Sequence, residues 1–222
     1  MDDRKLQIFM DSLLPLLKAA VAFTVPLTLI SFTIGLILAV ITALARLSSW
    51  RIPRLIARFY VWIIRGTPLL LQLFIIFFGL PSVGITLDPF IAAVIGFSLS
   101  VGAYGSEIVR ASILSIQEGQ WEAAYSLGMT RMQALRRVIL PQAARVSVPP
   151  LANSFISLVK DTSLAASITY VEMLRTAQQI VATTFEPLLL YTEAGLFYLL
   201  LSTVLSSLQN YLEKRLDRFS TR

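Results

Sequence analysis

The 222-residue sequence contains no cysteine and no histidine. Without cysteine the chain has no disulfide and no thiol nucleophile, and without either residue it cannot build the Cys/His sites that bind zinc. The imidazole that most often serves as a general acid or base is missing as well. We therefore expect no catalytic residue and no metal site.

Charge is also scarce, because only 14% of the residues are charged whereas 56% are hydrophobic. One globular core of this length cannot hide so much apolar surface. The composition therefore indicates an all-α, polytopic membrane protein. The net charge of +6 does not indicate nucleic-acid binding, because the positive residues fall between apolar runs, as topology signals do.

Long uncharged runs predict where the chain crosses the membrane, since a spanning helix needs about 20 mostly apolar residues. Four runs reach or approach that length: 19–45, 66–87, 89–106 and 194–212. A fifth run, 146–159, is either a buried helix or a span that includes charged residues. We expect five transmembrane helices in one domain at 17–212, with an extracytoplasmic segment at 1–16 and a cytoplasmic tail at 213–222. The mixed-charge N-terminus, MDDRK, does not resemble a cleaved signal.

The distribution of arginine and lysine predicts the orientation. Positive residues gather in 46–58, 110–145 and the C-terminal tail, whereas 79–88 has none and 161–193 has only Arg175. The positive residues of the three basic segments are Arg46, Arg51, Arg54, Arg58, Arg110, Arg131, Arg136, Arg137, Arg145, Lys214, Arg215, Arg218 and Arg222. The positive-inside rule puts these segments in the cytoplasm and the N-terminus outside.

The charged stretch 119–141 lies in the largest predicted cytoplasmic loop. Ser115 and Glu118 have the spacing of a capping box, so a helix is expected to begin there and to end at Pro141. Ala124 and Gly128 are four residues apart, which predicts a helix face with little side-chain bulk. Two interpretations follow from the residues: a solvated loop helix, or a surface that another protein approaches closely.

The spacing of residues in this loop resembles the EAA motif of ABC importer permeases. The matching residues are Glu122, Ala123, Ala124, Gly128, Val138, Leu140 and Pro141. The family prefers isoleucine where this chain has Val138. The resemblance implies that a loop at about 112–140 forms coupling helices that dock into a groove of a cytoplasmic ATP-hydrolysing subunit.

Further segments are similar to the polar amino acid uptake permeases, which are small five-helix members of the type I importers. These segments are RGTPLLLQLF at 65–74, AYGSEIVRA at 103–111, QWEAAYSLGM at 120–129 and PPLANSFISLVKDTSLAA at 149–166. The resemblance implies uptake of a polar amino acid across the bacterial inner membrane. L-cystine is the expected substrate, and glutamine, arginine and glutamate are the alternatives.

The same resemblance implies the partners. They are two ATPase subunits that carry ATP and magnesium, a second permease copy and an extracytoplasmic binding protein. The chain has no G-x-x-x-x-G-K-[ST] motif, so we expect it to bind no cofactor and not to hydrolyse ATP by that route. Five helices are few to enclose a polar path, which independently favours a dimer.

Charged residues near the apolar runs are candidates for the substrate path, because charge inside a bilayer is costly unless it lines a cavity or is paired. Lys160, Asp161, Thr162 and Ser163 directly follow the short fourth run. A helix that ends there would be broken within the membrane and would offer backbone groups to a substrate. The alternative is that Lys160 and Asp161 lie among lipid headgroups.

Two further pairs of residues have two interpretations each. Glu107 and Arg110 have the spacing of an ion pair on one helix face, either as a structural pair or in contact with substrate. Pro68 predicts a kink, beside which Thr67 and Gln72 either face a polar path or only pack. A structural role is expected for Pro26 and Gly35.

Two other functions remain open on the sequence alone. An ion-coupled secondary transporter would need intramembrane carboxylates and usually has inverted repeats, but the chain shows no convincing internal repeat. A non-transporting membrane scaffold would share the topology but would have no need of the EAA motif.

Overall fold

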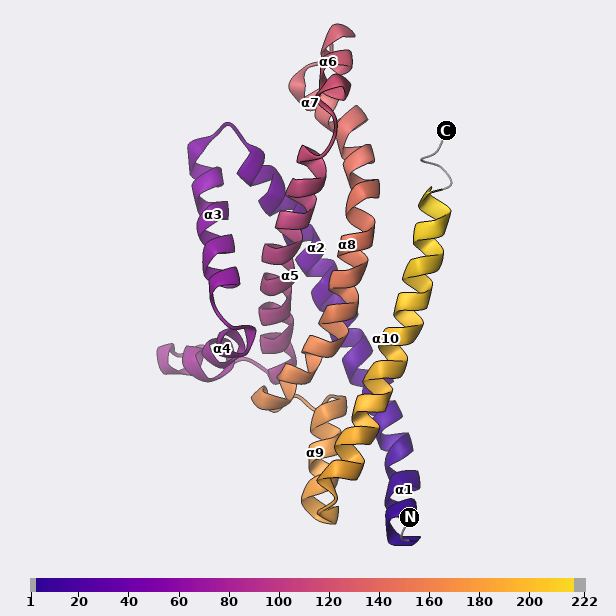
Figure 1. Ribbon diagram of the computed structural model, residues 1–222. Coiled ribbons are helices and arrows are strands. Elements are labelled where there is room, and N and C mark those ends of the chain that lie inside the picture. Colours follow the sequence, from indigo (N-terminus) through magenta and orange to yellow (C-terminus); the bar gives the residue numbers. More distant parts are fainter. Residues whose placement is uncertain (1–2, 218–222) are drawn as a thin grey trace.

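The computed structural model describes residues 3–217 and contains only helices and their connections within that range, as the composition predicts. The long helices run roughly side by side between two opposite ends of the molecule (Figure 1). The elements are α1 Asp3–Ala19, η1 Ala20–Thr24, α2 Val25–Leu47, α3 Arg51–Gly66, α4 Leu69–Phe74, η2 Ile75–Gly79, η3 Leu80–Val83, α5 Pro89–Leu114, α6 Glu118–Ser126, α7 Arg131–Ala134, η4 Leu135–Ile139, α8 Leu140–Asp161, η5 Thr162–Ile168, α9 Met173–Thr184 and α10 Pro187–Asp217.

Among the described residues, three helices are long and apolar enough to cross a membrane: Asp3–Leu47, Pro89–Leu114 and Pro187–Tyr211. The bent pair Arg51–Gly66 and Leu69–Val83 raises the number to four if it is one span. The helix that contains the short run, α8, does not pass the same test. The predicted number of five spans is therefore not confirmed.

The first helix is longer than the sequence predicted. It runs without a break from Asp3 to Leu47, across the expected boundary at residue 16. Leu16, Ala19 and Ala20 are buried in one cluster with residues of α9 and α10, including Met173. The N-terminal part of the chain is therefore packed against the rest of the protein.

The segment 46–58, expected to be a connection, is mostly helix. Helix α3 begins at Arg51, so only residues 48–50 connect it to α2. The predicted kink near Pro68 is confirmed, because α3 and the helices that follow it are bent by 105°. Proline cannot donate a backbone hydrogen bond and restricts the residue before it, which explains the break at Thr67.

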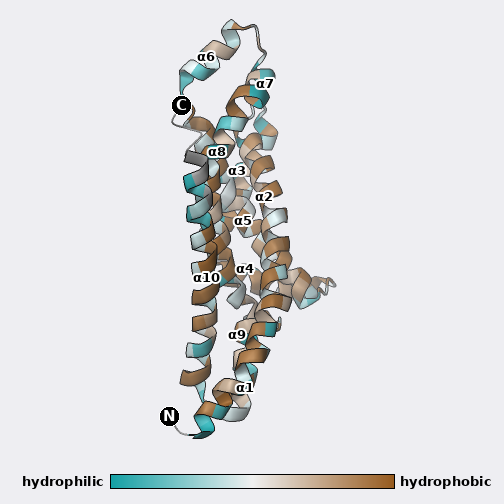
Figure 2. Cartoon of the chain, turned by 90° about the vertical axis from the view of Figure 1, so that its right-hand side faces the viewer, coloured by the Kyte–Doolittle hydropathy of each residue, from teal (hydrophilic) through white to brown (hydrophobic). Residues whose placement is uncertain are grey.

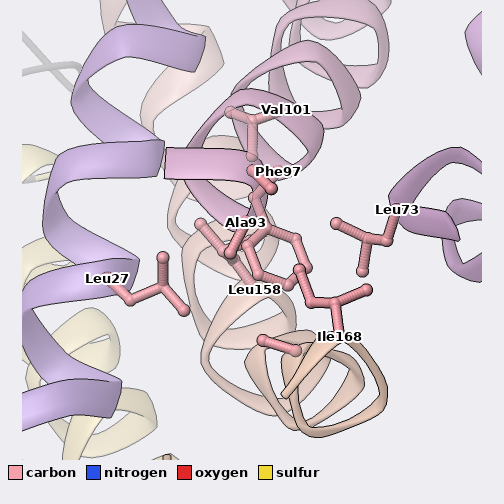
Figure 3. Close-up of a cluster of buried hydrophobic side chains, with 9 residues drawn as sticks. Leu27, Leu73, Ala93, Phe97, Val101, Leu158 and Ile168 are labelled. Carbon is pink, nitrogen blue, oxygen red and sulfur yellow. The ribbon is translucent and has the colours of Figure 1, made fainter. Parts of the chain in front are cut away.

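The core forms where α2 crosses α5. Gly35 and Gly102 let the two helices approach closely, since a Cβ on Gly35 would lie 2.5 Å from Val101 Cβ and one on Gly102 would lie 2.9 Å from Leu38 Cβ. Phe97 of α5 is fully buried. Figure 3 shows it among apolar side chains from α2, α4, α8 and η5, which together hold the centre of the bundle.

The two ends of the molecule differ in character. The α2–α3 connection, the α6–α7 loop and the end of α10 lie at one end, whereas the start of α1 and the α9 helix lie at the other (Figure 1). Hydrophobic residues dominate the middle of α2 and α10, and hydrophilic residues gather at α6, α7 and the start of α1 (Figure 2). The three basic segments therefore share one end, although Arg218 and Arg222 lie outside the described residues.

Candidate functional site

The loop with the EAA-like spacing is two helices joined by a tight turn, not the single helix expected from the sequence. Helix α6 ends at Ser126, and Gly128 has a φ of 75°, in the left-handed region. Met129 N–H donates to Ala124 O at 3.1 Å, and Gly128 N–H donates to Tyr125 O at 2.9 Å. This pair of bonds is a Schellman motif, whose left-handed residue is usually glycine.

The second helix of the loop has a capping box, but not the one predicted. Thr130 Oγ1 accepts from Gln133 N–H at 3.3 Å, and Gln133 Oε1 accepts from Thr130 N–H at 2.8 Å. The expected pair, Ser115 and Glu118, does not cap, because the Ser115 hydroxyl instead donates to Ser112 O. A capping box satisfies the free N–H groups at a helix start, so α7 begins sharply at Arg131.

Pro141 does not end the helix, which is a second correction. The helix continues from α7 through the π-helical turn η4 into α8, and Pro141 is the second residue of α8. The π-helical turn accommodates the proline, because a proline removes one backbone hydrogen bond and its ring crowds the preceding turn. Leu140 and Pro141 therefore lie inside a helix that runs from Arg131 to Asp161.

The predicted small face is also not formed as expected. Gly128 lies beyond the helix, and Ala124 is buried, with α6 lying against η4. Glu122 and Ala123 are exposed, as are the larger side chains of Tyr125 and Leu127. The outer surface of α6 therefore combines small and large side chains.

The loop is fixed to the bundle by both apolar and polar contacts. Trp121 packs on a cluster that contains Ile113 of α5 and Ile139 of η4. Gln142 Nε2 donates to Gln120 Oε1 at 3.1 Å across the loop. Helix α6 is therefore held against the bundle by both kinds of contact.

The α-helix α8 ends at Asp161, where the sequence predicted a break, and continues as the 3-10 helix η5. Lys160 and Asp161 are exposed. The Thr162 hydroxyl donates to Val159 O at 2.6 Å and the Ser163 hydroxyl to Lys160 O at 2.7 Å. Both hydroxyl groups therefore donate their protons to backbone carbonyls at the end of the helix.

A buried polar group at this end was missed by the sequence analysis. Glu172 is fully buried at the start of α9 and accepts hydrogen bonds from Leu174 N–H and Arg175 N–H at 2.9 and 2.8 Å. The Tyr198 hydroxyl of α10 donates to Glu172 Oε2 at 2.6 Å. Burial raises the pKa of the Glu172 carboxyl, and these hydrogen bonds oppose the rise. An acidic residue before a helical run was the available signal for this cap.

Glu107 is paired with Arg110, as the sequence predicted, but it also binds two arginines from other helices. Glu107 Oε1 lies 2.8 Å from Arg46 Nη1 of α2 and 2.9 Å from Arg65 Nη1 of α3. Glu107 Oε2 accepts from Arg110 Nε at 3.2 Å and from Arg110 Nη2 at 3.1 Å. Spacing along one helix could identify only Arg110, because the other two partners are distant in sequence.

Thr67 and Gln72 hold the bend between α3 and α4. Gln72 Nε2 donates to Ile64 O at 2.8 Å and to Thr67 Oγ1 at 2.9 Å, and the Thr67 hydroxyl donates to Ile63 O at 2.9 Å. Gln72 is buried. Its amide thus donates hydrogen bonds to carbonyl groups that the break in the helix leaves free.

Within residues 3–217, no three acidic side chains come close enough together to hold a metal ion. The arrangement is thus a basic end with an exposed loop, a bundle with a charged cluster, and a helix that breaks at the far end.

The comparisons with known proteins agree with this description. The family model described as the binding-protein-dependent transport system inner membrane component matches residues 34–218. The chain belongs to this family and is a permease component of an ABC importer.

The chain is similar to the L-cystine transport system permease protein TcyB of Bacillus subtilis (strain 168). The two are 55% identical over 210 residues, which cover 94% of this chain and 90% of the relative. The glutamine transport system permease protein GlnP of Escherichia coli (strain K12) is 37% identical over 205 residues and covers 91% and 94% of the two chains. The crystal structure of an amino acid ABC transporter with histidines matches with a TM-score of 0.88 at 35% identity, over 93% of this chain and 96% of that one.

Proposed function

We propose that this chain is the permease of an importer that takes up polar amino acids, with L-cystine as the substrate. The observation that carries the substrate is the 55% identity to an L-cystine permease along nearly the whole chain. Glutamine, arginine and glutamate are the alternatives, because a glutamine permease is 37% identical over a similar length.

The chain supplies the membrane path, and its partners supply energy and substrate. ATP and magnesium bind to two cytoplasmic ATPase subunits, a binding protein delivers the amino acid outside, and a second permease copy completes the path. The family is defined by dependence on a binding protein. The chain itself is surrounded by membrane lipid and binds no cofactor.

The α6–α7 loop is the docking surface for the ATPase. Glu122, Ala123, Tyr125 and Leu127 are exposed at one end of the molecule. Behind them Trp121 packs on the apolar cluster that contains Ile113 and Ile139. An exposed helix that is packed on the bundle at the basic end has the form that transmits movement from a partner.

The loop therefore faces the cytoplasm, with the end of α10, and the N-terminus lies outside. The positive-inside rule supports this orientation, since the basic segments gather at one end. The substrate path runs between the ends along the candidates Lys160, Asp161, Thr162, Ser163, Glu107, Thr67 and Gln72. Of these, the exposed Asp161 at the broken end of α8 is suited to an ammonium group.

Uptake of radiolabelled amino acids tests the function. A strain that lacks its own cystine carriers should import L-cystine when it expresses this chain with the ATPase and the binding protein. Lanthionine and djenkolate, which resemble cystine in length, should compete. Strong glutamine, arginine or glutamate uptake with no cystine signal would reject the substrate but not the importer.

A further inference from the structure

Three arginines surround one carboxylate toward the basic end of the bundle. Arg46, Arg65 and Arg110 come from α2, α3 and α5, and all three lie within 3.1 Å of a Glu107 oxygen. Each of the two carboxylate oxygens of Glu107 lies beside at least one guanidinium group. The cluster therefore joins three helices that are distant in sequence.

The cluster lies toward the basic end of the bundle. Glu107 precedes Leu114, the last residue of α5, by seven residues, which corresponds to about 10 Å along a helix, and Arg46 is one residue before the end of α2. Charges near the inner edge of the hydrocarbon core are costly against lipid unless they are paired or face water. The side of α5 that carries Glu107 is therefore expected to face a water-filled path or a second copy.

The charges of the cluster do not balance. Three guanidinium groups and one carboxylate leave two positive charges, and no other carboxylate lies within ion-pair distance of them among the residues that the structure describes. The side chains of Arg65 and Arg110 are 42% and 34% exposed, whereas that of Arg46 is 14% exposed. Arg65 and Arg110 thus keep donor groups open to an incoming anion, since a guanidinium has five N–H donors.

An aromatic ring orients one of these two arginines. The Arg65 guanidinium lies over the ring of Tyr104 at 5.3 Å from its centroid, in a cation–π contact. An apolar groove of 310 Å³ lies between α5 and α8. It is lined by Ile108, Ala111, Ser112, Ser115, Val146 and Pro150, and none of the arginines of the cluster lines it.

We propose that Arg65 and Arg110 form a carboxylate-binding site on the inner half of the translocation path, with Glu107 and Tyr104 as positioning residues. The ligand is a carboxylate group of the transported amino acid, which pairs with guanidinium groups in bidentate geometry. The site rests on the proposed function, because it needs a substrate that enters the membrane domain. Glu107 acts by holding the arginines and not by contacting the ammonium group.

The test is equilibrium binding of radiolabelled L-cystine to the purified permease–ATPase complex in phosphatidylcholine vesicles without the binding protein. Cystamine, which is cystine without its two carboxylates, should compete at least tenfold less well than L-cystine. Arg65→Gln and Arg110→Gln should each lower the affinity at least tenfold, and Arg65→Lys should restore part of it. Arg58→Gln, an exposed position on the same helix, is the matched control and should bind normally.

A second measurement separates this site from a structural role. ATPase activity stimulated by the binding protein should persist in Arg65→Gln and Arg110→Gln, because the docking loop is unchanged. Loss of that activity together with cystine binding would mean that the cluster only holds the helices and would overturn the proposal. If the imported amino acid does not bind to the wild-type complex, or if its decarboxylated amine competes equally well, the proposal is also overturned.

A lipid phosphate is the other oxyanion that could meet these arginines. If Arg65→Gln keeps its cystine binding, but loses activity only in vesicles that contain phosphatidylglycerol, the site binds lipid and the proposal fails. If the wild-type transporter imports a different amino acid, the substrate in the proposed function is wrong. The same binding assay with that amino acid and its decarboxylated amine then still tests the cluster.

Discussion

Gly128 is the residue at which one backbone angle shapes the proposed docking loop. A side chain there is strained because φ is 75°, although no atom lies within 4 Å of a Cβ at this position. Gly128→Ala should therefore weaken the turn by about 1 kcal/mol and reduce the amount of ATPase that co-purifies. The number of ATPase subunits retained per permease in detergent is the measurement.

Gly119 provides a matched control for this substitution. A Cβ there also meets nothing within 4 Å, but its φ is not positive. Gly119→Ala should leave ATPase binding at the wild-type level. Equal loss in both variants would mean that bulk on the outer surface matters, and not the left-handed turn.

The buried Glu172 predicts a measurable loss when its partner is changed. Tyr198→Phe removes the 2.6 Å hydrogen bond to Glu172, and a hydrogen bond to a charged group contributes about 1.5–3 kcal/mol. The thermal unfolding temperature of the purified protein should fall. Tyr191→Phe is the control, because Tyr191 is exposed on the same helix, and a similar fall there would show that the buried hydrogen bond adds nothing.

Asp161 at the break after α8 is the residue expected to hold the substrate's ammonium group. Asp161→Asn keeps the size of the side chain but removes its charge, and the loss of a hydrogen bond to a charged group costs about 1.5–3 kcal/mol. Uptake should fall by orders of magnitude, while ATPase activity stimulated by the binding protein persists. Normal uptake by the variant would place Asp161 among lipid headgroups, and Lys160→Met tests its neighbour in the same way.

At the level of the helices, a regular pattern links proline to the π-helical turns. The turns η1, η2 and η4 are each followed two residues later by a proline, and these prolines are Pro26, Pro81 and Pro141. In each case the carbonyl four residues before the proline lies within the π-helical turn. A wider turn separates the proline ring from that carbonyl, which otherwise clashes with it. The long helices α1–α2 and α7–α8 therefore pass through their prolines without ending.

This pattern also explains where sequence-based prediction failed. Hydrophobic runs located α2, α5 and α10, because burial in lipid depends on composition alone. Pro68 correctly predicted a bend, whereas Pro141 wrongly predicted a helix end. The two prolines have different surroundings. At the bend near Pro68, Gln72 satisfies the carbonyls that the break leaves free, whereas a π-helical turn before Pro141 keeps the helix intact.

The candidate site was only partly predictable for a related reason. The pair Glu107–Arg110 has helical spacing and could be read from the sequence. The contacts of Glu107 with Arg46 and Arg65 depend on how α2 and α3 pack on α5, for which one sequence has no signal. The cap by Glu172 was detectable from local spacing, but its bond to Tyr198 was not.

At the level of the whole molecule, the position of the basic end predicts which surface reagents can reach. The chain has no cysteine, so single cysteines can be introduced without a background. A cysteine at Ser48, in the short connection at the basic end, should not react with an impermeant thiol reagent added outside. A cysteine at Thr183, which is exposed in α9 at the opposite end, should react.

Permeabilised cells provide the control for this labelling. Both cysteines should react once the membrane is open, which excludes burial as the cause of protection. Labelling of Ser48→Cys in intact cells, with Thr183→Cys protected, would show that the orientation is the reverse of the proposed one. The helix packing would not be affected by that result.

The unbroken helix from Arg131 to Asp161 gives the molecule a mechanical property. Its 31 residues form a rod about 46 Å long at the usual rise per residue. One end carries the turn that faces the proposed motor subunit, and the other is where the helix gives way to η5. If this helix moves as one body about its middle, near Pro149 and Pro150, a push of a few ångströms at Arg131 moves the Asp161 end by a similar distance in the opposite direction. Opening at one side of the membrane would thus be geometrically tied to closing at the other, with no signal relayed from residue to residue.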